Sequence, residues 1–213
     1  MALRFATLWE TVLHLGAGRW KRREPITGPD SLQGFIETRS NLVAQASLYG
    51  YLRTRAGMRY PELFSDDVFV RSINIAKWQL WLACLADLSV YAGGLLAQRT
   101  QAQPERIGEL MGGVVEGILA ATGVPAEAGS DFAAGAQHAR ARIALCAWAS
   151  VPDDETAFSE SPAALVRCAP IVDELKQLDE PIVRNSVRFR WQEVRRDLRR
   201  DLDAFAVLAS AKP

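Results

Sequence analysis

Apolar residues recur at steps of three and four positions along most of this chain, which is the spacing of one face of an α-helix. No segment alternates apolar and polar residues in the way that a half-buried strand does. The pattern therefore predicts an all-α protein, and the length of 213 residues favours a single domain with one core. We expect a bundle of six or seven helices, in which residues 1–28 form a short N-terminal helix and a basic linker that can pack at the periphery.

A long helical hairpin over residues 31–98 dominates the pattern. Its first helix is expected to run from Ser31 to about Ala56. The tripeptide Ser-Asp-Asp at residues 65–67 is an N-cap signal, because carboxylates there accept free amide protons, so the second helix is expected from Val68 to about Gln98. Proline, glycine and cap residues delimit further helices over residues 104–123, 131–149 and 161–178, and a last helix that begins at Pro181.

The last predicted helix has the most regular periodicity. One apolar stripe is expected to pack on the bundle, and it consists of Val183, Val187, Trp191, Val194, Leu198, Leu202 and Phe205. Arginine residues lie mostly outside this stripe, and acidic residues alternate with them at helical spacing. One interpretation is a salt-bridged surface. The other is a basic docking face for an acidic partner or an anionic lipid surface.

Two charged residues stand within the apolar stretches of the hairpin. Asp87 lies in the middle of the almost wholly apolar residues 78–97, where an unpaired carboxylate is costly to bury. Arg39 shares a helical stripe with apolar residues on both sides of it, so each helix of the hairpin is expected to carry one core-facing charge. Residues 78–97 are nearly long enough to cross a bilayer, but the central carboxylate favours a buried core helix.

Polar and aromatic residues crowd the same hairpin, and such a density can form a pocket. The candidate residues are Arg39, Tyr49, Arg53, Arg71, Asn74, Lys77 and Asp87. The favoured interpretation is a polar network that satisfies these groups and fixes the register of a tightly packed hairpin. The alternative is a ligand site in which the basic side chains hold an anionic head group.

The charges balance overall, with 25 basic and 25 acidic residues, but the two ends of the chain are basic and the middle is acidic. A protein partner is expected to dock on the basic ends, through Arg19, Lys21, Arg22, Arg23, Arg195, Arg196 and Arg199. Residues 5–13 also form an apolar face that is followed by the basic cluster at 19–23, so peripheral contact with an anionic membrane surface is a further possibility.

Known catalytic signatures are missing from the sequence, including the nucleophile elbow, the phosphate loop and the dinucleotide-binding glycine motif. The two histidines, His14 and His138, have no ligand spacing, so we expect no metal and no cofactor. Three widely spaced cysteines in apolar sequence fit free thiols, and the N-terminus lacks the apolar region of a signal peptide. These features favour a cytoplasmic protein.

Residues 46–52, with the sequence Ala-Ser-Leu-Tyr-Gly-Tyr-Leu, resemble the Leu-Tyr-x-Tyr-Phe turn that ends the DNA-binding region of TetR-like regulators. Those regulators are also all-α and of similar length. The resemblance covers seven residues, and residues 39–46 continue as an amphipathic helix without the tight glycine-containing turn of the family, so we do not assign the chain to it. DNA binding stays a minor alternative, supported by the basic first sixty residues.

The favoured hypothesis is a non-catalytic adaptor, assembly factor or regulatory protein that acts through protein–protein contacts. The alternative is a pocket protein for an anionic or amphipathic small molecule, a class that includes an enzyme of unfamiliar type. Whether the polar side chains of the hairpin converge on a cavity or pair between packed helices discriminates between the two.

Overall fold

The computed structural model describes residues 25–211, and the expectations for Arg19, Lys21, Arg22 and Arg23 and for an N-terminal helix lie outside this range. Within the described residues the fold is all-α, as the sequence predicts, with seven helices and three short 3₁₀ segments. The helices are α2 (Pro29–Ala56), α3 (Asp67–Thr100), α4 (Pro104–Thr122), α5 (Phe132–Ala144), α6 (Glu160–Cys168), α7 (Asp173–Asp201) and α8 (Ala204–Ser210). The 3₁₀ segments are Gly57–Ser65, Trp148–Ser150 and Glu155–Ala157.

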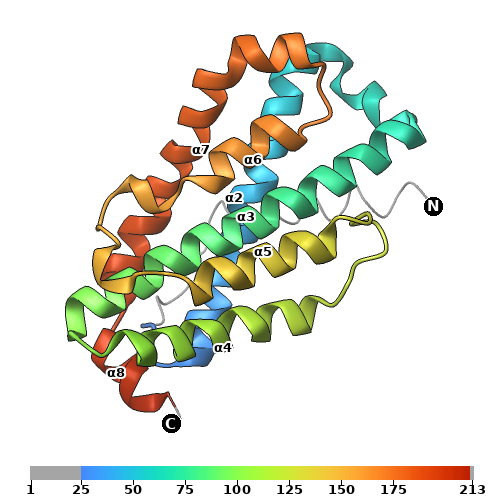
Figure 1. Cartoon of the computed structure of the whole chain (residues 1–213). Coiled ribbons are helices and arrows are strands. Elements are labelled where there is room, and N and C mark those ends of the chain that lie inside the picture. The colour runs from blue at the N-terminus through green and yellow to red at the C-terminus, as the bar shows by residue number, and fades with distance from the viewer. Residues whose placement is uncertain (1–24, 212–213) are drawn as a thin grey trace.

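Helix α3 is the centre of the bundle. Every residue from Leu80 to Leu96 is buried, and the helix contacts α2, α4, α5, α6 and α8 (Figure 1). Its most apolar window is long and hydrophobic enough to cross a membrane, but 94% of that window is buried inside the bundle. This burial agrees with the prediction of a core helix. Burying so much apolar side chain is the main favourable term in the stability of the fold.

The hairpin of α2 and α3 forms close to its predicted limits. Asp66 caps α3, because its Oδ1 atom accepts hydrogen bonds from the amides of Val68 at 2.8 Å and Phe69 at 3.2 Å. Helix α2 ends at Ala56, and the next residue, Gly57, has a φ of 55°, a conformation that glycine adopts without strain. The connection between the two helices is a 3₁₀ segment rather than an irregular loop.

Three helix limits differ from the sequence-based expectations. Helix α5 ends at Ala144 and not near residue 149, and α6 ends at Cys168 and not near residue 178. Helix α7 begins at Asp173, eight residues before the expected start at Pro181, so the proline lies inside the helix. The acidic first turn of α7 explains the early start, since carboxylates there oppose the positive end of the helix dipole. Figure 1 shows α7 curving over one end of the bundle and then following its edge.

The predicted apolar stripe of the last helix is interrupted at Leu202. This residue has an extended conformation and forms a parallel bridge with Ile26, in which Ile26 N donates to the Asp201 carbonyl at 2.8 Å. The amide of Asp203 in turn donates to the Ile26 carbonyl at 3.0 Å. Asp203 then caps the separate helix α8, and Phe205 on that helix is 69% exposed instead of packed.

Candidate functional site

The carboxylate of Asp87 is completely buried at the middle of α3. Its Oδ1 atom accepts hydrogen bonds from Arg142 Nη1 at 2.6 Å and from the Glu160 amide at 3.2 Å, while Oδ2 accepts from the Ser161 amide at 2.7 Å. Burial raises the pKa of this carboxyl, and the Arg142 guanidinium and the hydroxyl and amide of Ser161 act in the opposite direction. The pairing that the sequence requires therefore exists, with an arginine from α5 and not with Arg39.

The contacts of Asp87 extend across three further helices. Arg142 on α5 also donates to the Ala157 carbonyl at 2.9 Å and lies 3.3 Å from a carboxylate oxygen of Glu160 on α6. Ser161 Oγ accepts a hydrogen bond from Trp191 Nε1 on α7 at 2.9 Å, with both atoms buried. Both oxygens of Asp87 are bound within the fold, so this carboxylate joins packed helices and caps the start of α6.

The other charged hairpin residues have separate partners. Arg39 donates to Asp197 on α7 at 3.0 Å, and Lys77 pairs at 3.6 Å with Glu127 in the connection between α4 and α5. Burial lowers the pKa of Lys77, and its Nζ lies 4.8 Å from the centre of the Trp78 ring. Lys77 and Asp87 are ten residues apart on α3, which separates them by about 15 Å along the helix and turns them to different faces.

The remaining residues of the expected ligand site are spread over both helices. Arg53 on α2 and Arg71 on α3 are exposed, and Tyr49 and Asn74 are half-buried. Burial, followed by the neighbouring Tyr60, raises the pKa of Tyr49. Of the charged residues in the predicted set, Arg39, Lys77 and Asp87 pair with three different parts of the fold and do not converge on one ligand.

The prediction that Arg195 belongs to an exposed basic docking face is wrong, because this side chain is buried. Its side chain is only 10% exposed, and its Nη2 donates to the Asp153 carbonyl at 3.0 Å. Arg199 lies 3.3 Å from the carboxylate of the same aspartate, which also accepts a hydrogen bond from Tyr91. Both arginines thus hold the connection between α5 and α6 against α7. Of the predicted C-terminal set, Arg196 is the strongly exposed member, with 67% of its side chain accessible.

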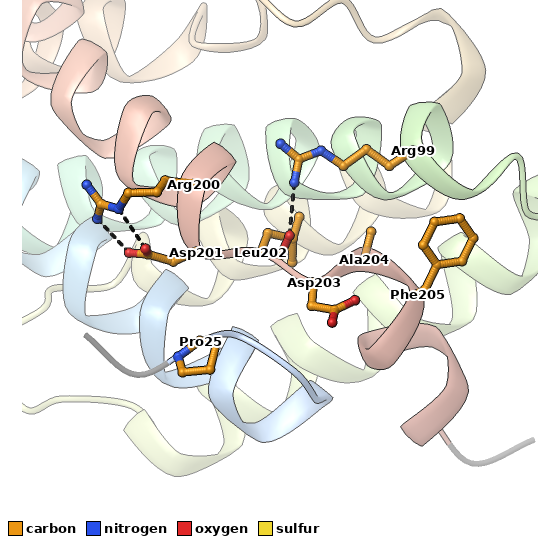
Figure 2. Close-up of a pocket in the computed structure, with 8 residues that line it drawn as sticks. All are labelled: Pro25, Arg99, Arg200, Asp201, Leu202, Asp203, Ala204 and Phe205. Carbon is orange, nitrogen blue, oxygen red and sulfur yellow. Dashed lines mark hydrogen bonds and ion pairs between the residues drawn. The ribbon is translucent and has the colours of Figure 1, made fainter. Parts of the chain in front are cut away.

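A surface depression of about 530 Å³ lies where residue 25 enters the fold, far in sequence from most of the expected ligand site. Figure 2 shows that Arg99 reaches from α3 to the Leu202 carbonyl, while Arg200 binds the carboxylate of Asp201. The charged groups of its wall are engaged with the backbone or with each other. Within residues 25–211, no three His, Cys, Asp or Glu side chains are grouped as a metal site requires.

The least expected feature is an apolar stripe on the solvent side of α7. Leu178, Ile182 and Phe189 are 74%, 73% and 71% exposed, and Leu175 is 37% exposed. The helical repeat places all four on the outer side of the curved helix, away from the buried stripe of Val183 to Leu198, with Leu175 and Leu178 before the internal Pro181 and Ile182 and Phe189 after it. We call Leu175, Leu178, Ile182 and Phe189 the outer stripe. The spacing of Ile182 and Phe189 can be recognised in the sequence. Leu175 and Leu178 precede the expected helix start at Pro181, so the sequence did not assign them to the same helix.

Exposed large apolar side chains that share the outer side of one helix are candidates for an interaction surface. Comparison with protein-family models, with curated proteins and with solved structures found no match to this chain. The outer stripe is therefore the candidate functional site on the strength of its own geometry.

Proposed function

We propose that this protein is a non-catalytic helical protein that acts through protein–protein contacts, with the outer stripe of α7 as the contact surface. The supporting observation is the exposure of Leu178, Ile182 and Phe189 at helical spacing along one edge of the bundle. An amphipathic helix face of this kind is suited to docking against another helix or groove. Such a protein would work as an adaptor, an assembly factor or a regulatory partner.

The polar residues of the hairpin favour this function over a ligand pocket. Arg39, Lys77 and Asp87 stabilise contacts between helices, and each has a partner on a different element. Their energetic role is to satisfy buried groups and fix the packing of the bundle. We place the protein in the cytoplasm, because Cys84, Cys146 and Cys168 are free thiols.

The test compares assemblies that are purified untagged from the native cytoplasm under mild conditions. Native mass spectrometry of the wild type is expected to show a stoichiometric protein assembly, whether with a second copy or with another chain. Ile182→Glu should abolish it, since a carboxylate replaces an apolar anchor at the centre of the stripe. Val124→Glu is the matched control, because Val124 is 75% exposed but lies in the connection between α4 and α5.

Both variants should keep the circular dichroism spectrum and the melting temperature of the wild type. A chain that carries a retained small molecule and no protein would contradict the proposal and favour the pocket hypothesis. An assembly that survives Ile182→Glu would show that the contact surface lies elsewhere.

A further inference from the structure

We propose that the depression at the junction of α7 and α8 is the docking site of residues 5–13 of the same chain, with Phe205 as their main contact. This inference is independent of the outer stripe. It is argued from the lining of the depression, from the place where the chain enters the described fold, and from the apolar face that the sequence predicts for residues 5–13.

The depression is mostly apolar, and one large side chain of its wall is uncovered. Leu202 and Ala204 are buried in the lining, whereas Phe205 is 69% exposed and lies at one end of it (Figure 2). Helix α7 ends before the extended residue Leu202, and Phe205 belongs to the separate helix α8, so its ring does not join the buried stripe. An exposed aromatic ring beside a hollow of about 530 Å³ is a suitable contact for apolar side chains.

The charged groups of the wall do not select an anionic ligand. Arg99 donates from both Nη atoms to backbone carbonyls, at 2.9 Å and 2.7 Å, and Arg200 binds the carboxylate of Asp201. Asp203 accepts a hydrogen bond from an amide of α8. These two basic and two acidic residues also balance each other in charge. The depression is therefore suited to an apolar occupant with a polar outer face.

The part of the chain that precedes the described residues begins at this depression. Pro25 is one of the lining residues, and Ile26 is fixed by hydrogen bonds to the Asp201 carbonyl at 2.8 Å and the Asp203 amide at 3.0 Å. Eleven residues separate residue 13 from Pro25, and a chain of this length spans about 20 Å on average. Residues 5–13 can therefore reach the depression, and the short connection holds them near it at roughly millimolar effective concentration.

Residues 5–13 have the apolar face that such a hollow requires. Phe5, Leu8, Trp9, Val12 and Leu13 recur at helical spacing. A segment of this length is too short to be a stable helix alone in water, where isolated helices need about 12–15 residues. Packing against the bundle would remove apolar surface of both the segment and Phe205 from water, which is favourable. A separate protein would have to compete with this tethered segment for the same depression.

Hydrogen exchange of the full chain, followed by mass spectrometry, tests the proposal. In the wild type, the amides of residues 5–13 should exchange at least about tenfold more slowly than in a free peptide of the same sequence. Phe205→Glu should bring their rates to within about twofold of the free peptide, because a carboxylate replaces the apolar contact. Val124→Glu is the matched control, since Val124 is 75% exposed in the connection between α4 and α5, and it should leave the protection unchanged.

A reciprocal variant acts from the segment itself. Leu8→Glu should speed exchange of the amides of α8, because the segment no longer covers that helix, while the amides of α3 keep their wild-type rates. Both variants should keep the circular dichroism spectrum of the wild type. The protection should also be independent of protein concentration, because the segment docks on its own chain.

Three results would overturn the inference. The first is a wild type in which residues 5–13 exchange like the free peptide, and the second is protection that survives Phe205→Glu. The third is protection that requires a high protein concentration or added phosphatidylserine vesicles, since the occupant would then be a second copy or the apolar face of residues 5–13 would contact a membrane instead. None of these results bears on the outer stripe, so the proposed function stands or falls separately.

Discussion

Replacing Asp87 by alanine tests the buried network that connects α3, α5 and α6. The substitution leaves the Arg142 guanidinium and the amides of Glu160 and Ser161 without their acceptor. Removing one partner of a buried ion pair costs about 3–5 kcal/mol, and a buried unsatisfied amide costs about 1–3 kcal/mol. Arg142 keeps the Ala157 carbonyl and the Glu160 carboxylate, which offset part of the loss. We therefore expect the free energy of unfolding to fall by about 3 kcal/mol.

The assay is urea unfolding at neutral pH, followed by circular dichroism and tryptophan fluorescence. The midpoint should shift to lower urea at an unchanged slope, since the surface exposed on unfolding stays the same. Glu62→Ala is the control, because Glu62 also pairs with an arginine but is 68% exposed, so its loss should leave the midpoint almost unchanged.

A double-mutant cycle isolates the pair itself. Arg142→Ala should also destabilise the protein, because it leaves the Asp87 carboxylate buried with only two amide donors. The double variant should cost less than the sum of the two single variants, since neither charge is then left alone. An Asp87→Ala variant within about 0.5 kcal/mol of the wild type, or strictly additive variants, would refute the reasoning.

Two further predictions concern packing and ionisation. A Cβ atom at Gly93 would lie 2.3 Å from a ring carbon of Trp148, so Gly93→Ala should lower the free energy of unfolding by about 1–3 kcal/mol in urea titrations. Gly112→Ala meets nothing within 4 Å and should instead raise it by about 0.5–1 kcal/mol. Burial, and then the hydrogen bond to Asp153, raise the pKa of Tyr91 to about 12, against about 10 in an unfolded chain. Stability should therefore fall as the pH rises from about 10 to 12, because only the unfolded chain releases this proton there. Alkaline unfolding curves should show a smaller fall for Tyr91→Phe, and equal curves would contradict the assignment.

Several elements were predictable because their signals are local. The three-and-four periodicity predicted the helices of the hairpin, and the Ser-Asp-Asp sequence at 65–67 predicted the cap at Asp66. The burial of Asp87 followed from its apolar neighbours in the chain. The start of α7 was missed because the proline at 181 was read as a boundary, whereas the preceding turns and the acidic cap residues outweigh it.

The sequence by itself determined the all-α class, the hairpin helices and the buried stripe from Val183 to Leu198, since these depend on residues within one or two turns of each other. Only the tertiary structure decided that Asp87 meets Arg142, 55 residues away, and that Arg195 is buried against Asp153. It also decided that Ile26 pairs with Leu202 and so ends α7. These contacts depend on how helices cross one another, and many arrangements of the same amphipathic helices bury the same apolar stripes. The outer stripe became a candidate site for the same reason, because a second apolar face is visible in the sequence but only packing shows that nothing within residues 25–211 covers it.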